Sequence, residues 1–291
     1  MLENPIILAA LISFVLGLVL SGLARVVPGS TIASAVLPII FLASYVLTYQ
    51  QVPDFPPIGA TNKIFYIALA AALVGFALDL LPRTANYRKL LAAIMPLLIV
   101  GWIGFPRFAK LDIELTATAL GLWLGGTALL WRLDTVATTP AERNGGSIVG
   151  TAVLMALMLA FAPVALLGGS STSLMLCLAA VAGLAAVALW ELVLPRGAFG
   201  ASAVFGVGCG LLAMVDTVTL ITKHVDLAAL ALLLLIPYAG EVGARLLLPP
   251  KRWARPPGSC RDLCGLAYSP GDSGFISSPS RVFVMRSEPC A

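Results

Sequence analysis

Two carboxylates within long apolar runs, Asp216 and Glu241, are the residues of this sequence that best suit chemistry. An ionisable side chain inside a membrane span is costly, and such residues usually bind ions, protons or solutes. Asp216 lies about 7–8 Å of helical rise inside the end of its predicted helix. The hydroxyls of Thr217 and Thr219 flank it and suit a polar path. We therefore predict a substrate- or ion-binding site made of Asp216, Glu241, Thr217 and Thr219. The alternative for Asp216 is a packing helix with one polar end.

Glu241 belongs to the segment Pro237–Gly243, which contains one proline and two glycines. Proline removes a backbone hydrogen bond, and glycine loosens a helix. We therefore expect a broken helix that carries a carboxylate, as transporters use at ion or substrate sites. The alternative is a kink in which Glu241 pairs with Arg245.

Two further acids, Asp79 and Glu191, occur near the ends of apolar runs. Each is followed by an arginine, Arg83 in one case and Arg196 in the other. This spacing predicts interfacial side chains that reach towards the lipid headgroups beside a basic neighbour.

Other kinds of chemistry find little support in the sequence. There is one histidine, and Cys260-x-x-x-Cys264 has no histidine or second cysteine pair beside it, so we expect no zinc site. The patterns of the common nucleotide-binding and hydrolytic motifs do not occur. We therefore predict no catalytic residue, no cofactor and no metal. An enzyme acting on a lipid-linked substrate would have to use the polar segment Leu133–Asn144, which fits an ordinary connection better.

The elements that must position these acids are membrane helices. Hydrophobic residues make up 59% of the 291 residues and charged residues 11%, and the mean hydropathy is +0.99. Soluble proteins carry about 25% charged residues. This composition excludes a soluble enzyme, a nucleic-acid-binding domain and a disordered chain. It predicts an all-α, polytopic bundle of transmembrane helices.

A spanning helix needs about 20 mostly apolar residues, and nine segments of the chain qualify. The first lacks a positively charged start, so we interpret it as a retained helix rather than a signal peptide. The nine segments are Pro5–Val27, Thr31–Tyr49, Lys63–Leu81, Leu90–Pro106, Ile113–Trp131, Ser147–Leu167, Ser173–Leu194, Ala198–Ile221 and Leu227–Leu248.

Basic residues between these segments predict the orientation of the chain. With the N-terminus outside and the C-terminus in the cytoplasm, the cytoplasmic side holds eleven of them and the opposite side four. The richness in arginine, alanine, glycine and leucine is typical of a bacterial protein, so we expect the inner membrane.

Two parts of different composition make up the chain. Residues 1–249 form the predicted bundle, and residues 250–291 form a polar, basic tail that we expect to be disordered and cytoplasmic. Within the bundle, Leu16–Gly22 is similar to Leu120–Gly126. This similarity indicates a tandem four-helix repeat, 5–106 and 113–221, followed by a ninth helix, 227–248, as parallel repeats occur in transporters. The alternative is that spans rich in leucine, alanine and glycine are similar by composition alone.

The leading functional hypothesis is a permease or transporter-like protein that handles a small solute or ion in the lipid bilayer. The first alternative is a non-catalytic membrane subunit or assembly factor. The second is a membrane-embedded enzyme acting on a lipid-linked substrate. The intramembrane acids and the predicted repeat favour transport over both.

Overall fold

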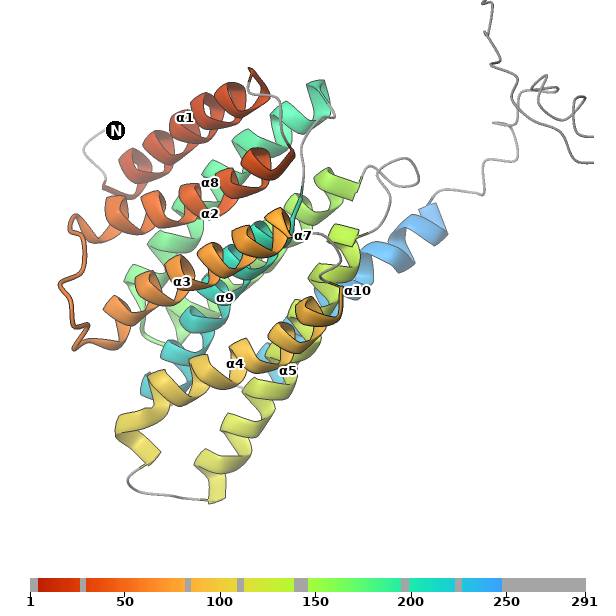
Figure 1. The fold of residues 1–291 in the computed structure, drawn as a ribbon. Coiled ribbons are helices and arrows are strands. Elements are labelled where there is room, and N and C mark those ends of the chain that lie inside the picture. The colour runs from red at the N-terminus through yellow and green to blue at the C-terminus, as the bar shows by residue number, and fades with distance from the viewer. Residues whose placement is uncertain are drawn as a thin grey trace, which may run out of the picture. The chain divides into compact units, whose positions relative to one another are not determined.

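The computed structural model describes residues 5–26, 30–81, 85–108, 113–138, 146–194, 199–222 and 227–247 (Figure 1). Of these residues 92% are helical, and they contain no strand. The helices are α1 (Pro5–Val26), α2 (Ser30–Tyr49), α3 (Ala60–Leu80), α4 (Ala85–Phe108), α5 (Ile113–Thr138), α7 (Gly146–Leu167), α8 (Ser171–Val193), α9 (Ala201–Thr217), the π-helix η1 (Val218–Thr222) and α10 (Leu227–Leu247).

Seven helices are long and apolar enough to cross a membrane: α1, α3, α4, α5, α7, α8, and α9 together with η1. In α2 and α10 the apolar stretches that the structure describes are shorter, Ala33–Tyr49 and Ala228–Ala239. The prediction of an all-helical chain of apolar helices is therefore confirmed, and it is compatible with a multi-pass membrane protein. The number of nine spans and the orientation of the termini stay predictions.

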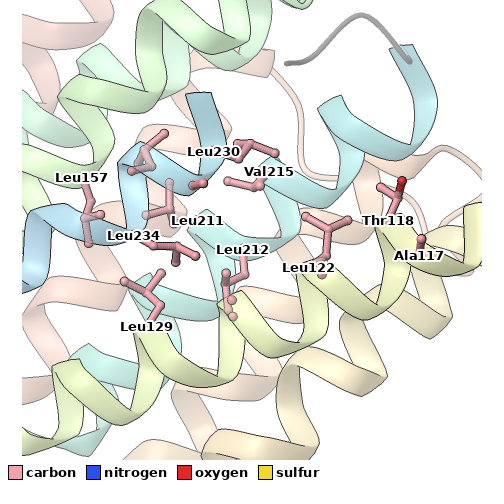
Figure 2. Close-up of a pocket in the computed structure, with 15 residues that line it drawn as sticks. Ala117, Thr118, Leu122, Leu129, Leu157, Leu211, Leu212, Val215, Leu230 and Leu234 are labelled. Atoms are coloured by element: carbon pink, nitrogen blue, oxygen red, sulfur yellow. The ribbon is translucent and has the colours of Figure 1, made fainter. Parts of the chain in front are cut away.

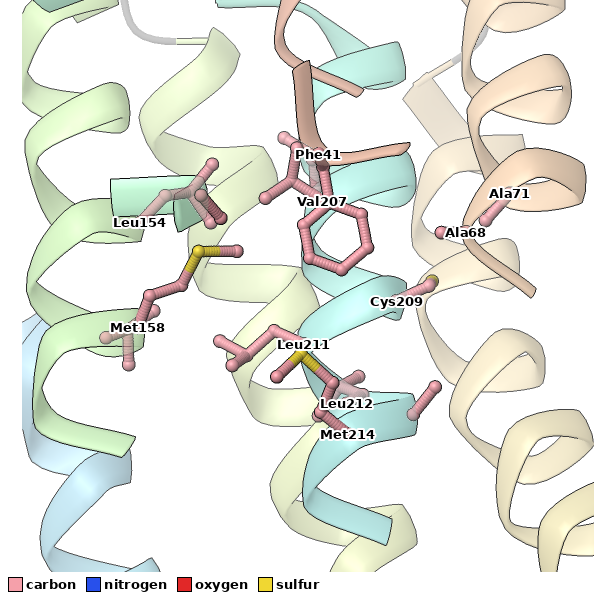
Figure 3. Close-up of a cluster of buried hydrophobic side chains, with 14 of the residues drawn as sticks. Phe41, Ala68, Ala71, Leu154, Met158, Val207, Cys209, Leu211, Leu212 and Met214 are labelled. Atoms are coloured by element: carbon pink, nitrogen blue, oxygen red, sulfur yellow. The ribbon is translucent and has the colours of Figure 1, made fainter. Parts of the chain in front are cut away.

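Helix α9 lies at the centre of the described helices, in contact with α2, α3, α4, α5 and α7. All of its side chains except that of Val215 are buried. Its small residues allow this, because they let neighbouring backbones approach closely. The tightest approach is at Gly75 of α3, where an added Cβ would lie 2.5 Å from the carbonyl oxygen of Ala201. Figure 3 shows Phe41, Ala68 and neighbouring side chains packed around this central helix.

Helices α1 and α8 form a second close pair. A Cβ added at Gly17 of α1 would lie 2.6 Å from the carbonyl oxygen of Gly183 in α8. The position equivalent to Gly17 in the predicted repeat is Gly121 of α5, where an added Cβ would meet no atom within 4 Å. The two similar segments therefore pack in different ways, and the duplication remains a hypothesis.

Five prolines lie inside helices: one in α2, two in α4, one in α7 and one in α10. None of them ends its helix. Helix α10 continues as an α-helix through Pro237 to Leu247. The prediction of a broken helix around Glu241 is therefore wrong for the backbone. A proline removes one hydrogen bond, and the rest of a membrane helix keeps its own. The irregular backbone instead follows α9, where η1 begins at Val218.

The chain divides into two compact units, Met1–Ala244 and Arg245–Ala291. Asp216 and Glu241 both belong to the first unit. The predicted tail, 250–291, lies outside the described residues, together with its cysteines. The same holds for Arg83 and Arg196, on which the interfacial interpretation of Asp79 and Glu191 depends.

Candidate functional site

Asp216 is buried at the C-terminal end of α9, with 2% of its surface exposed. Its carboxyl group makes no hydrogen bond or ion pair with the residues that the structure describes. A buried polar group without a partner costs free energy, and a buried unpaired charge costs much more. Such a group is therefore a candidate for binding something other than the described side chains.

The two threonines of the predicted site differ from each other. Thr217 Oγ1 is buried and has no hydrogen-bond partner among the described residues. Thr219 Oγ1 donates to the carbonyl oxygen of Val215 at 2.7 Å, so its proton is used within its own helix. Asp216 and Thr217 are therefore consecutive buried residues of α9 whose polar side-chain groups lack described partners.

The backbone changes directly after these two residues. Val218–Thr222 form the π-helix η1, a rare conformation that is often found at functional sites. At its end, Arg107 Nη2 of α4 donates to the carbonyl oxygen of Ile221 at 2.8 Å. The arginine thereby occupies one carbonyl group that the end of the helix leaves without an internal partner.

Glu241 lies in α10, but its side chain is outside the part of the chain whose side chains the structure describes. Nearby, α10 contacts α5, because the Arg132 guanidinium carbon lies 5.3 Å from the centre of the Tyr238 ring. Arg132 Nε also donates to the carbonyl oxygen of Pro237 at 3.4 Å. The structure therefore tests neither the pairing of Glu241 with Arg245 nor its relation to Asp216.

A second buried carboxylate, Asp79 of α3, lies at the opposite end of α9. Its Oδ1 atom accepts hydrogen bonds from Arg88 Nη2 at 2.9 Å and from the amide of Ala201 at 2.8 Å. Its Oδ2 atom accepts from the amide of Ser202 at 3.0 Å and from Ser34 Oγ at 2.9 Å. Asp79 therefore caps the first turn of α9, where free amides and the helix dipole favour a negative charge.

The hydrogen bonds around Asp79 extend to α5 through Arg88 of α4. Arg88 Nη1 of α4 lies 3.4 Å from Asp134 Oδ1 of α5, so one guanidinium bridges two carboxylates. The exposed fractions of these side chains are 15% for Arg88 and 8% for each aspartate. Ser202 Oγ donates to Ser34 Oγ at 2.9 Å and adds α2. We call Asp79, Arg88, Asp134, Ser34 and Ser202 the inner polar network.

Two interpretations from the sequence change with this network. Asp79 does not reach out to the interface, because its carboxylate is buried against the start of α9. That prediction was wrong. Asp134 is part of α5, which continues to Thr138, and its carboxylate is engaged by Arg88. Asp134, the first acid of the polar segment Leu133–Asn144, therefore binds Arg88 in a contact between helices. This gives no support to an active site built on Asp134.

One feature of the local sequence indicated that the start of α9 needs a hydrogen-bond acceptor from another part of the chain. The residue before α9 is Gly200, which has no side chain to cap the helix. An added Cβ at Gly200 would lie 2.5 Å from Asp79 Oδ2, so the glycine also makes room for the incoming carboxylate. A buried helix start that lacks its own capping side chain requires an acceptor from elsewhere. The sequence does not say which acid supplies it.

Lys63 in the first turn of α3 is a buried cation, with 8% of its surface exposed. Its Nζ atom donates to the carbonyl oxygen of Trp102 in α4 at 2.8 Å and lies 5.9 Å from the centre of the Trp102 ring. In a regular helix that carbonyl would accept from residue 106, but Pro106 has no amide proton. Lys63 therefore replaces the hydrogen bond that Pro106 removes.

A pocket of about 240 Å³ lies between α5, α7, α9 and α10 (Figure 2). Val215 and Leu212 contribute to its wall, but Asp216 is not among the lining residues. Its lining is aliphatic apart from Thr118. The lining residues are Ala117, Thr118, Gly121, Leu122, Gly125, Gly126, Leu129, Leu157, Leu211, Leu212, Val215, Leu230, Ala231, Leu233 and Leu234.

Comparisons of the chain with known protein families, with curated proteins and with solved structures give no match. Any function must therefore be argued from the residues themselves.

Proposed function

We propose that this protein is a transporter-like protein of a bacterial inner membrane that couples the movement of a small solute to protons bound at Asp216. The observation that supports this proposal is the carboxyl group of Asp216, which is 2% exposed and has no partner among the described residues. Acids in membrane spans are costly and are usually kept for function. The adjacent π-helix and the unpartnered hydroxyl of Thr217 strengthen the argument.

A proton suits this site better than a metal cation. Calcium and magnesium require about six or more oxygen ligands. The described residues contain no group of three His, Cys, Asp or Glu side chains that suits a metal. A single carboxyl group in apolar surroundings becomes neutral when it binds a proton, which removes most of the cost of its burial.

A buried cation at a similar depth also supports a polar path near Asp216. Helices α3 and α9 pack with Gly75 beside Ser202. Lys63 is about 18 Å of helical rise from Gly75, and Asp216 is about 21 Å from Ser202. The two charged residues therefore lie at similar levels on neighbouring antiparallel helices, yet they form no ion pair. Lys63 is held by the carbonyl oxygen of Trp102, so it leaves Asp216 without a basic partner on α3.

Glu241 is the second station of the proposed path. It lies on α10, the helix that follows Asp216 in the chain, and the proposal includes the predicted nine spans with the N-terminus outside. The contacts of α5 with α9 and with α10 support different levels for the two acids. Gly125 is beside Leu234 and Gly126 is beside Leu212. Glu241 is therefore about 10 Å or more from the level of Asp216 by helical rise.

A non-catalytic membrane subunit is the second candidate. The inner polar network favours it, because the hydrogen bonds of Asp79 are made within the protein and join four helices, and the ion pair of Arg88 with Asp134 adds a fifth. A protein whose polar groups serve only packing would show such networks throughout. Asp216 departs from this pattern and favours transport.

Uptake and metabolite profiling of a deletion strain identifies the solute. The purified protein is then placed in liposomes that enclose a pH-sensitive dye, which tests whether solute movement is coupled to proton movement. We expect the solute gradient to drive proton movement in the unmodified protein. Asp216→Asn and Glu241→Gln should abolish this movement while the amount of folded protein stays normal. Glu114→Gln is the matched control, because Glu114 is an exposed acid in the first turn of α5. Full proton coupling in both Asp216→Asn and Glu241→Gln would end the proposal.

A further inference from the structure

We propose that the pocket between α5, α7, α9 and α10 binds one acyl chain of a membrane phospholipid. This inference is independent of the role of Asp216, which is outside the pocket. The lining side chains are aliphatic except for that of Thr118, whose Oγ1 atom donates to the carbonyl oxygen of Glu114 at 2.9 Å. A polar solute would find few hydrogen-bond partners in it, whereas a methylene chain matches its walls.

The length and depth of the pocket fit one leaflet of a bilayer. Along α5 the lining runs from Ala117 to Leu129, which corresponds to about 18 Å of helical rise. The hydrocarbon core of a bilayer is about 30 Å thick, so the pocket covers roughly one half of it. In the predicted orientation this is the outer half, because α5 begins on that side. Figure 2 shows Thr118 and Ala117 at one end and Leu157 and Leu129 at the other.

Charged residues flank both ends of the α5 wall of this pocket, Glu114 one turn before Thr118 and Arg132 one turn after Leu129. The end at Glu114 also has Arg107 at its level, and this pair suits a zwitterionic headgroup. Gly126 packs beside Leu212, so antiparallel pairing places Thr118 at the level of Leu220. Arg107 binds the carbonyl oxygen of Ile221, one residue further on. The exposed acid Glu114 lies one turn before Thr118. A phosphate would be attracted by Arg107 and an ammonium group by Glu114, as in phosphatidylethanolamine.

Glycine keeps the pocket open. A Cβ added at Gly121 would meet no atom within 4 Å, so the space beside this residue is unfilled by protein. One turn further, a Cβ at Gly125 would lie 3.0 Å from Leu234 Cδ1, so α5 and α10 are in contact there. A volume of about 240 Å³ is too small for a helix of a partner protein, whose diameter is about 10 Å. A single extended chain is the occupant that fits.

Photochemical labelling tests the proposal on the full chain. The protein is reconstituted with a phosphatidylethanolamine that carries a photoactivatable diazirine in the middle of one acyl chain, and adducts are mapped by peptide mass spectrometry. We expect adducts at pocket residues such as Leu122 and Leu230 to exceed those at the exposed leucines Leu120 and Leu124 several-fold. Ordinary lipid around the bundle would label the exposed leucines at least as strongly.

Two variants fill the pocket from opposite walls, Gly121→Leu on α5 and Ala231→Leu on α10. Each should reduce the pocket adducts several-fold and leave the other adducts unchanged. Gly101→Leu in α4 is the matched control, because a Cβ there also meets no atom within 4 Å and Gly101 does not line the pocket. Gel filtration establishes that each variant is folded. Equal labelling of pocket and exposed leucines, or pocket adducts that survive in a folded filling variant, would overturn the proposal.

Discussion

The two ends of α9 each hold a buried aspartate, and the two aspartates are in opposite situations. Asp79 receives two backbone amides, a hydroxyl and a guanidinium at the start of the helix. Asp216, near the other end, receives no hydrogen bond from the described residues, although it is buried more completely. Burial alone therefore does not distinguish a structural acid from a candidate functional acid. The hydrogen-bond partners do.

This difference assigns opposite energetic roles to the two ends of the helix. At the start of α9, the inner polar network converts a buried charge into contacts among five helices. At the end of α9, the π-helix follows a buried carboxyl group and a buried Thr217 hydroxyl that have no partner among the described residues. Replacing side chains at the first end should therefore change stability, and replacing them at the second should change activity.

The largest effect is expected for Arg88→Met. Removing the guanidinium leaves the carboxylates of Asp79 and Asp134 buried without their shared cation. Breaking a buried ion pair from one side costs about 3–5 kcal/mol. We expect a marked fall in the thermal unfolding midpoint of the detergent-solubilised protein, and recovery of part of it in the double variant Arg88→Met/Asp134→Asn.

Lys89→Met is the control for Arg88→Met, since Lys89 is the next residue of the same helix and its side chain is exposed. Its unfolding midpoint should stay close to that of the unmodified protein. If Arg88→Met were as stable as Lys89→Met, the inner polar network would not hold the helices together, and its contrast with Asp216 would disappear.

The apolar helices were predictable because a membrane sets a local requirement of length and apolarity that each segment meets by itself. Asp216 could be selected as a candidate for the same reason, since a charge within an apolar run is visible locally, and Thr217 and Thr219 were selected because they flank it. The partners of Asp79 were not, because Ser34 and Ser202 are 45 and 123 residues away in the chain. The nearby Arg83 therefore gave a misleading explanation of this acid.

The positions at which the backbone departs from a regular α-helix were also not predictable from local sequence. Pro237 and the two glycines after it indicated a break, but α10 continues as a helix there, since a proline removes only one hydrogen bond of a helix. The residues of η1, Val218–Thr222, have no proline or glycine and gave no sign of a π-helix. Local sequence identifies where a hydrogen bond is removed, but it does not show whether the helix continues past that point.

An intermediate effect is expected when the two aspartates are compared directly as asparagines. Asp79→Asn removes a charge that binds the helix start and Arg88, and hydrogen bonds to charged groups contribute about 1.5–3 kcal/mol. We expect a loss of about 2 kcal/mol in the free energy of unfolding. Asp216→Asn loses no hydrogen bond to the described residues, so its change should be below about 1 kcal/mol. Urea unfolding of both variants in the same detergent measures the difference, and equal losses would contradict the contrast.

The smallest effect concerns Lys63, the buried cation near the level of Asp216. Lys63→Met leaves the carbonyl oxygen of Trp102 without a donor, because Pro106 has no amide proton. An unsatisfied buried group costs about 1–3 kcal/mol, and since Lys63 is at a helix end we expect about 1 kcal/mol. In a Pro106→Ala background residue 106 regains its amide and can donate to the Trp102 carbonyl, so Lys63→Met should then cost less.

The four proteins of this double-mutant cycle give the coupling energy between Lys63 and Pro106 from their free energies of unfolding. A cycle with Pro96→Ala is the matched control, because Pro96 is in the same helix and frees the carbonyl group of Ala92, which Lys63 does not bind. We expect coupling of about 1 kcal/mol with Pro106 and close to none with Pro96. Equal coupling in both cycles would mean that Lys63 does not replace the missing hydrogen bond. The burial of Lys63 near the depth of Asp216 would then need another explanation, such as a role in moving protons.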